Sequence, residues 1–340
     1  MRKTIAVDAM GGDHGPSVIV PAVVKALKAY PELKFILVGD EAILRKEFSH
    51  CHVNVNEFSA SGHLAIHQSS QVVGMDEPPA QALRYKKDSS MRVAINLVKS
   101  GEAQACVSAG NTGALMATAR FVLKTIPGID RPAISSWLPN VVGSTQVLDL
   151  GANIDSSESH LFQFAVMGSV LAQARGIEKP RIGLLNIGQE EIKGSELIRA
   201  ASRRLMETTT LNYIGFVEGD DIYKGSTDVI VCDGFVGNIA LKTSEGLARM
   251  SAKIVRDAFS AHWWSKCLAV LVSPVLKRAG RRLDPRLYNG ASLVGLRGIV
   301  IKSHGSADVV AFTNALREAS REIDHNIPAL IANRIAEFIK

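Results

Sequence analysis

Five short loops rich in glycine, aspartate and asparagine are the parts of this sequence best suited to bind a ligand. Each loop follows an apolar run that reads as a β-strand, and the loops cover residues 8–13, 108–111, 149–153, 186–188 and 233–238. In open α/β sheets, ligands bind outside the carboxyl ends of the strands. Backbone N–H groups at the start of a following helix bind anions. We therefore expect the five loops to converge on one site.

The first of these loops lacks the spacing of the common nucleotide-binding motifs. Asp13 and Pro16 occupy the second and third glycine positions of G-x-G-x-x-G. The triplets at 193–195 and 224–226 place lysine before glycine, the wrong order for a P-loop. No G-x-S-x-G segment, which would indicate a nucleophilic serine, occurs. These absences disfavour a nicotinamide dehydrogenase and a P-loop nucleotidase.

The elements that would position the loops alternate between strand-like and helical patterns. The predicted strands cover residues 4–7, 35–38, 53–58, 105–108, 133–138, 146–150, 182–185, 213–217, 229–232 and 298–302. The predicted helices cover residues 21–30, 91–99, 115–124, 159–174, 196–208 and 307–323. This alternation is typical of a doubly wound α/β fold with a mostly parallel sheet. We predict a single domain over residues 1–340.

Composition and charge narrow the classes of partner. The net charge of +6 favours acidic partners such as phosphate, an acidic protein or anionic lipid. Aromatic residues do not interleave with the basic ones, which disfavours nucleic-acid binding. The four cysteines include no C-x-x-C pair, which suits a reducing cytosol. The apolar run after Met1 stops at Asp8, so no signal peptide is expected.

Taken together, eight sequence blocks are more specific than any single loop. They are AVDAMGGDHGP (6–16), KKDSSM (86–91), SAGNTGALMA (108–117), IDRPA (129–133), DLGAN (149–153), GLLNIGQEEIKG (183–194), GNIALKTSEG (237–246) and YNGASLVGLRGIVIKSHGSA (288–307). In this order, over nearly the whole chain, the blocks closely resemble the acyl-carrier-protein:phosphate acyltransferases, the PlsX family.

The resemblance implies a fold, a reaction and partners. The fold would be a three-layer α/β/α sandwich similar to phosphate acetyltransferases and the isocitrate dehydrogenase group. The reaction would transfer a long-chain acyl group from acyl carrier protein to inorganic phosphate, without metal, cofactor or covalent intermediate. The acyl-phosphate would feed a membrane glycerol-3-phosphate acyltransferase in phospholipid synthesis. The protein would be a homodimer in the cytoplasm, peripherally associated with the inner face of the cell membrane.

In such a reaction a phosphate oxygen attacks the thioester carbonyl and a thiolate leaves. The site must bind a dianion, align it and stabilise the tetrahedral oxyanion. We predict that Lys193 holds phosphate or neutralises the oxyanion, and that His304 is the general acid for the thiolate. For both residues the alternative is an ordinary loop role: a solvated lysine, and a donor that fixes its loop.

The remaining candidates line the loops. Asn111 is the third predicted catalytic residue, because it stands where N–H donors at a helix start would face a ligand; its alternative is a helix cap. Asp13 and His14 would orient phosphate or polarise a water, and their alternative is turn chemistry. The other predicted substrate-binding residues are Gly110, Thr112, Gly113, Asn153, Asn186, Asp233 and Asn238.

Residues 241–283 depart from the α/β alternation. Leu247, Met250 and Ile254 fall on one face at helical spacing, and an apolar run follows at 267–276. This run is too short to span a bilayer, and Pro274 is expected to end its helix. Tryptophans favour the lipid–water boundary and basic residues meet anionic head groups. We predict a helical excursion that contacts both the partner subunit and the membrane; the alternative is an apolar run buried in the dimer core.

The excursion also carries the residues expected to meet the membrane or the carrier protein. The residues predicted to contact the membrane or the carrier protein are Trp263, Trp264, Leu271, Arg278, Arg281 and Arg282, and Arg286 extends the basic stretch. Acyl carrier proteins are strongly acidic, so a basic stretch suits docking.

Two other functions remain open at this point. One is a phosphate acyltransferase that uses short acyl-coenzyme A, and the other is a non-catalytic scaffold that binds acyl carrier or lipid.

Overall fold

A computed structural model describes residues 3–338 of this chain, except for the side chains at 276, 277, 279 and 281–283. The strands are β1 (Lys3–Asp8), β2 (Leu33–Gly39), β3 (Leu64–Gln68), β4 (Ala105–Ser108), β5 (Ala133–Pro139), β6 (Ser144–Leu148), β7 (Ile182–Leu185), β8 (Tyr213–Val217), β9 (Val229–Val231), β10 (Ala291–Val294) and β11 (Ile299–Lys302). The helices are α1 (Pro16–Ala29), α2 (Glu41–His50), α3 (Val55–Ala60), α4 (Pro79–Tyr85), α5 (Ser90–Ser100), α6 (Thr112–Leu123), α7 (Glu158–Ala174), α8 (Glu196–Glu207), α9 (Asp221–Lys224), α10 (Gly234–Ser260), α11 (Trp263–Leu283), the short η1 (Pro285–Tyr288), α12 (Val309–His325) and α13 (Ile327–Ala336).

Within the described residues the strands form one 11-stranded sheet in the order β3-β2-β1-β4-β11-β10-β5-β6-β9-β7-β8. β1, β2, β3, β4 and β11 run parallel to one another, and so do β6, β9, β7 and β8. Between these two groups, β10 is antiparallel to both β11 and β5, and β5 is antiparallel to β6. Three successive reversals leave the two parallel groups running in opposite directions.

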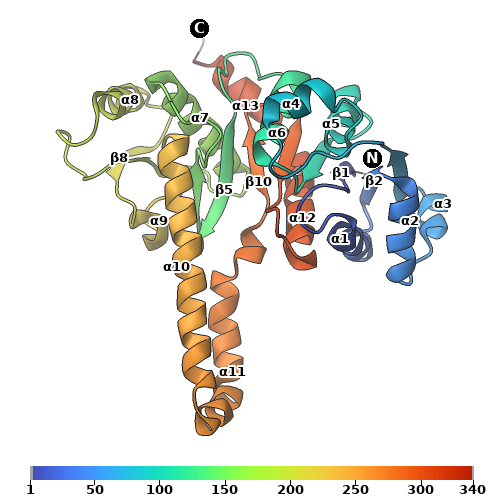
Figure 1. Ribbon diagram of the computed structural model, residues 1–340. Coiled ribbons are helices and arrows are strands. Elements are labelled where there is room, and N and C mark those ends of the chain that lie inside the picture. The colour runs from blue at the N-terminus through green and yellow to red at the C-terminus, as the bar shows by residue number, and fades with distance from the viewer. Residues whose placement is uncertain (1–2, 339–340) are drawn as a thin grey trace.

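Helices cover both faces of this sheet, which makes the predicted three layers (Figure 1). On one face, α5, α6 and part of α10 bury a continuous apolar cluster against strands of both groups. On the other face, α1, α2 and α12 pack over the first group of strands, and α7, α8 and α13 pack over the second. Burial on both faces explains why the strands read as apolar runs rather than as alternating patterns.

Most predicted elements are present, but two predictions are corrected and two strands were missed. Residues 53–58 are not a strand, because the side chain of Asn54 accepts a hydrogen bond from Asn56 N and starts α3. β3 and β10 were not predicted. Pro274 does not end its helix, because α11 continues through it to Leu283. Of the four cysteines, Cys267 is exposed, whereas Cys106 and Cys232 are buried.

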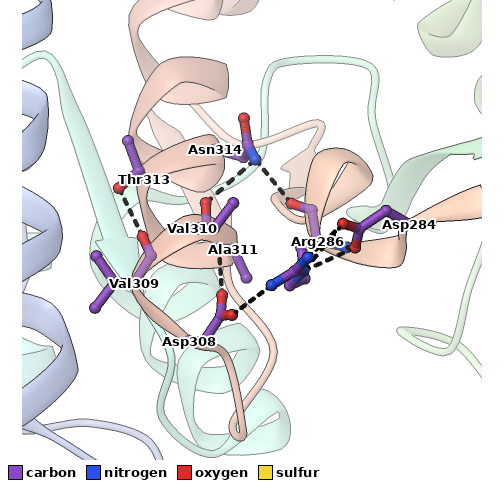
Figure 2. A network of polar contacts seen from close by, with 8 residues as sticks. All are labelled: Asp284, Arg286, Asp308, Val309, Val310, Ala311, Thr313 and Asn314. Carbon is purple, nitrogen blue, oxygen red and sulfur yellow. Dashed lines mark hydrogen bonds and ion pairs between the residues drawn. The ribbon is translucent and has the colours of Figure 1, made fainter. Parts of the chain in front are cut away.

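The predicted helical excursion is a pair of helices that leaves the body of the protein, as Figure 1 shows. We call α10 from Leu241 onward together with α11 the hairpin. Its base is fixed by Arg286, which follows α11. The guanidinium pairs with Asp284 at 2.7 Å and with Asp308 at 3.1 Å, and Asp308 also caps α12 by accepting from Ala311 N (Figure 2). Asn314 on α12 donates to the Arg286 carbonyl oxygen. The network ties the return of the hairpin to α12.

α12 carries a buried acid, Glu322. Glu322 on α12 is 4% exposed, and its Oε1 has no hydrogen-bond partner among the described residues. It lines a small cavity with Ser292, Ile327 and Ile331. Burial, aided by the charge of Glu318 and opposed by that of Arg175, raises the pKa of Glu322 to about 8. Glu322 is therefore protonated in the folded chain at neutral pH.

This burial makes stability depend on pH. A carboxyl whose pKa rises on folding contributes its full stabilisation below its unfolded pKa, and this contribution is lost as pH rises from there through the folded pKa. Glu322→Gln, which resembles the protonated acid, should therefore match the wild type near pH 5 and exceed it near pH 9 by up to about 4 kcal/mol of unfolding free energy. Urea denaturation at both pH values measures this. The exposed Glu207→Gln is the control, and equal stability of Glu322→Gln and wild type near pH 9 would contradict the prediction.

Candidate active site

Three loops meet where β1, β4 and β11 end, a region we call edge A. Asp13 N donates to Gly305 O at 2.9 Å. A Cβ placed on Gly12 would lie 2.9 Å from Ala109 Cβ and 3.0 Å from Gly305 O, and its φ is +89°. Only glycine fits a backbone that is both left-handed and this closely packed. Edge A therefore brings together the predicted residues Asp13, His14, Gly110, Asn111, Thr112, Gly113 and His304.

A buried carboxyl beneath edge A fixes the first two loops. Asp8 is 1% exposed, and its two oxygens accept from the hydroxyls of Ser90 and Ser108, each at 2.6 Å. Ser108 Oγ in turn accepts from Gly110 N at 3.0 Å. Burial raises the pKa of Asp8, and the two serine hydrogen bonds oppose that rise. The chain of contacts sets the position of Gly110 relative to the end of β1.

Lys302, which sequence analysis missed, carries the deepest positive charge at edge A. It is the last residue of β11 and is 8% exposed. Its Nζ donates to Ala109 O at 3.3 Å and to Ser303 O. Burial lowers the pKa of Lys302 to about 8, although the charges of Asp8 and Asp13 oppose that fall. The sequence signal was a lysine that closes an apolar strand directly before the His304 loop.

His304 lies exposed at the same edge with a defined tautomer. Its Nδ1 accepts from Ser306 N at 3.2 Å and lies 2.9 Å from Ser306 Oγ. We therefore assign the proton of the neutral ring to Nε2. Although the residue as a whole is exposed, its ring is partly desolvated, which lowers the pKa of His304; the charges of Lys242 and Lys302 act in the same direction and those of Glu245 and Asp13 against it. At neutral pH His304 is a neutral donor at Nε2.

A second residue missed by sequence analysis holds the His304 loop. Asn289 Oδ1 accepts from His304 N at 3.0 Å. Asn289 Nδ2 donates to Ser303 Oγ and to Ala311 O, both at 2.8 Å. These three bonds tie the loop after β11 to α12. Asn289 therefore positions His304 without facing the open side of the edge.

Asn111 has its side chain fully engaged. Its Oδ1 accepts from Ala114 N at 3.0 Å and caps α6, while its Nδ2 donates to Met75 O and Glu77 O. This geometry matches the helix-cap alternative, and the catalytic role of Asn111 stays a prediction. Thr112 and Gly113 are exposed in the first turn of α6, where backbone N–H groups lack intrahelical acceptors.

The remaining predicted residues lie elsewhere, so the expected convergence of five loops is wrong for one chain. β6, β7 and β9 run opposite to β1, β4 and β11, and their carboxyl ends lie at the other edge of the sheet, edge B. The antiparallel strands β10 and β5 cause this reversal. Edge B carries Asn153, Asn186, Lys193, Asp233 and Asn238.

Several edge B side chains hold the backbone. Asp149 is fully buried and accepts from Ile134 N and from the backbone and side chain of Asn153. Asn153 Nδ2 also donates to Pro132 O, and Asp233 caps α10 by accepting from Val236 N. A Cβ on Gly237 would collide with Asp149 O, so the first turn of α10 is seated against this loop. These contacts make edge B the anchor of α10.

Two predicted residues of edge B are open to solvent. Lys193 and Asn238 are both exposed, and Asn186 Nδ2 donates to Lys193 O at 3.3 Å. The contact fixes the loop backbone and leaves the Lys193 amine free to move. The binding roles of the edge B residues stay predictions.

Helix α10 connects the two edges. Its first turn is seated at edge B, and further along it Tyr223 OH donates to Ser244 Oγ. Lys242 and Glu245, which form an ion pair at 3.0 Å, act electrostatically on His304 at edge A. Sequence analysis selected neither residue, because charged residues on the surface of a helix are normally solvated.

Edge A thus combines the parts needed to bind an anion and to donate a hydrogen bond beside it. The cationic groups are Lys302 and Lys242, and the first turn of α6 adds N–H donors. His304 adds an N–H donor at Nε2. Such an arrangement stabilises negative charge on two neighbouring atoms.

The predicted contact residues lie on the hairpin, away from both edges. Trp263 is 79% exposed, Trp264 55% and Leu271 77%, and Arg278 is also exposed. The side chains of Arg281 and Arg282 lie outside the described residues. Arg286 is held by the two aspartates of Figure 2. The apolar run of α11 faces solvent in the single chain, so the packing of this chain does not bury it.

Among solved structures, the fold is similar to that of a phosphotransacetylase and of a branched-chain phosphotransacylase. A phosphotransacetylase from Streptococcus pyogenes matches with a TM-score of 0.66 at 17% identity, covering 95% of this chain and 94% of that one. A branched-chain phosphotransacylase from Enterococcus faecalis V583 matches with a TM-score of 0.55 at 16% identity, covering 94% and 99%. At these identities the likeness concerns the fold.

Sequence comparison is more specific. The family model described as fatty acid synthesis protein matches residues 3–330. The phosphate acyltransferase of Halorhodospira halophila is 56% identical over 337 residues, which cover 99% of this chain and 97% of that protein. The phosphate acyltransferase of Legionella pneumophila (strain Paris) is 54% identical over 338 residues, with the same coverage. This chain therefore belongs to the phosphate acyltransferase family (PlsX), a family of acyltransferase enzymes that the fatty acid synthesis protein model describes.

Proposed function

We propose that this phosphate acyltransferase takes a long-chain acyl group from acyl carrier protein and transfers it to inorganic phosphate at edge A. The product is an acyl-phosphate that a membrane glycerol-3-phosphate acyltransferase uses for phospholipid synthesis. The observation that carries the proposal is the meeting of Lys302, the first turn of α6 and His304 at one edge. It supports a site for a dianion with a hydrogen-bond donor beside it.

The residues of edge A would act in a single displacement. Phosphate is held by the charge of Lys302 and by backbone N–H groups of the first α6 turn. A phosphate oxygen forms a bond to the thioester carbonyl carbon, the C–S bond breaks, and its electron pair goes to sulfur. His304 Nε2–H donates a hydrogen bond to the sulfur as charge develops, while Asn289 and Ser306 hold the ring and loop. No enzyme nucleophile takes part.

The first prediction tests the reaction. The purified chain should release the carrier thiol from long-chain acyl carrier protein only when inorganic phosphate is present, because phosphate is the nucleophile. A thiol-reactive dye measures the release. Acyl-coenzyme A in the same assay tests the alternative donor. Thiol release that is indifferent to phosphate would indicate a thioesterase, and no release with either donor would favour a scaffold.

The second prediction concerns Lys302. A lysine with a pKa near 8 loses its positive charge as pH rises through that value, so affinity for phosphate should fall on the alkaline side. In Lys302→Arg the charge persists, and the alkaline limb of kcat/KM for phosphate should move up by more than about one pH unit. The exposed Lys25→Arg should keep the wild-type profile. An unchanged limb in Lys302→Arg would show that another group titrates.

Lys193 raises a separate question, because within one chain it lies at the edge opposite to His304. We propose that the protein is a homodimer and that Lys193 of one protomer serves the site of its partner. Exposed apolar residues near edge B support a subunit contact there; they include Ile154, Ile187, Ile192, Phe235 and Ile239. Loss of one oxyanion or phosphate donor typically lowers the rate by roughly 10²–10³.

The third prediction tests this arrangement by complementation. Lys193→Ala and His304→Ala should each be at least about a hundredfold slower than wild type. Mixed and allowed to exchange subunits, they should regain about one quarter of wild-type activity, because half the dimers then hold one intact site. No recovery from two inactive parents would place both residues in one chain's site. A Lys193→Ala variant with normal turnover would remove Lys193 from the chemistry.

The hairpin supplies the proposed membrane contact. Among the described residues, no helix combines the length and apolar character needed to cross a bilayer. Three apolar residues of the hairpin are nonetheless largely exposed: Trp263, Val270 and Leu271. We propose that the part of the hairpin around Trp263 and Leu271 lies in the interface of an anionic membrane. The basic stretch that includes the exposed Arg278 receives the acidic carrier protein.

The fourth prediction separates membrane contact from burial in a dimer. Leu271→Glu should stay dimeric and active in solution yet fail to sediment with vesicles of phosphatidylglycerol, because a charge at the interface opposes insertion. Val142→Glu is the control, since Val142 is as exposed but lies on the β5–β6 turn. Aggregation or dissociation of Leu271→Glu into monomers would assign the run to the subunit contact instead.

A further inference from the structure

A pocket lies beside Asn289, the residue that holds the His304 loop, and none of the arginines in this pocket is used by the proposed reaction. It has a volume of about 240 Å³, is open to solvent, and lies between the end of α7, β5, η1 and the middle of α12. We call it the arginine pocket, after the residues that define it: Trp137, Arg175, Tyr288, Arg317, Glu318 and Arg321. A cavity of this volume is slightly smaller than the sites of drug-sized ligands, so it suits a small ligand.

The charges of the arginine pocket do not balance. Three guanidinium groups face one carboxylate, that of Glu318. Glu318 pairs with Arg175 at 2.6 Å and with Arg321 at 3.4 Å. Arg317 makes neither an ion pair nor a hydrogen bond with any residue that the structure describes, and its Nε is buried without a partner. The pocket therefore keeps two uncompensated positive charges, and the N–H donors of Arg317 have no partner among the described residues.

The walls hold these groups in place before any ligand arrives. The Arg175 guanidinium lies 4.2 Å from the centroid of the Trp137 ring, and Trp137 is only 8% exposed. Such a stack, together with the ion pair to Glu318, fixes the fork geometry of Arg175. Arg317 and Arg321 stand one turn apart on α12, so their side chains share a face. A preorganised cationic pocket loses little entropy when it binds an anion.

The charge count selects the ligand. Guanidinium forks bind both carboxylates and phosphoryl groups in a bidentate manner. A phosphomonoester above pH 7 carries two negative charges on one group, which match the two uncompensated charges here, whereas a carboxylate carries one. We propose that the arginine pocket is a binding site for a small phosphomonoester, distinct from the site at edge A.

The test uses Trp137 as the reporter in the full-length chain. Trp263→Phe and Trp264→Phe leave it as the only tryptophan of the three in the sequence. Titration with glycerol 2-phosphate near pH 8 should give a saturable change in its fluorescence, whereas acetate at equal ionic strength should not. Arg317→Gln should raise the half-saturation concentration at least about tenfold, and the exposed Arg256→Gln should leave it unchanged.

Two further variants keep the result decisive. Arg317→Lys retains the charge without the fork and should fall between wild type and Arg317→Gln; it also serves if Arg317→Gln does not fold. Lys302→Met should keep the fluorescence response, because the proposed catalytic site is separate. Equal responses to acetate and glycerol 2-phosphate, or equal half-saturation in the wild type and both Arg317 variants, would overturn the proposal. Loss of the response in Lys302→Met alone would assign the signal to edge A.

Discussion

The reversal of strand direction at the centre of the sheet is the constraint on which the rest of this structure depends. Because β10 and β5 lie antiparallel to their neighbours, the two parallel groups present their carboxyl ends at opposite edges. Edge A gathers Lys302, His304 and the start of α6, while edge B seats the start of α10. A uniformly parallel sheet would have placed all the polar loops together, as the loop pattern alone suggested.

Charge at edge A is controlled by burial rather than by exposed pairs. Asp8 and Lys302 are both nearly inaccessible, and each has a pKa shifted toward its neutral form. Their mutual attraction opposes the cost of burial for both. The backbone oxygens of Ala109 and Ser303 hold the lysine head group. The edge thus keeps a titratable cation near the working pH, where an exposed lysine would stay charged.

Local signals predicted most of the fold. Apolar runs gave β4, β7 and β8 with their boundaries, and the eight blocks identified the family correctly. The direction of each strand in the sheet could not be predicted, because the spacing and hydrophobicity of its side chains are the same whichever way it runs. Residues 53–58 show how a short alternating run is overridden by one capping asparagine. At the site, His304 and Gly113 follow from loop chemistry. Lys302 was signalled only by its place at the end of an apolar strand, and Asn289 acts through contacts with Ser303, His304 and Ala311 that no local pattern encodes.

Helix α10 also has a mechanical consequence. It is seated at Gly237, where the backbone touches the Asp149 loop, and it extends without interruption to Ser260, giving a rod of roughly 40 Å for its 27 residues. Lys242 lies near the fixed end and the hairpin tip at the free end. No turn or loop separates the two ends of this helix, so the segment that carries Lys242 and Glu245 beside His304 is also one arm of the hairpin.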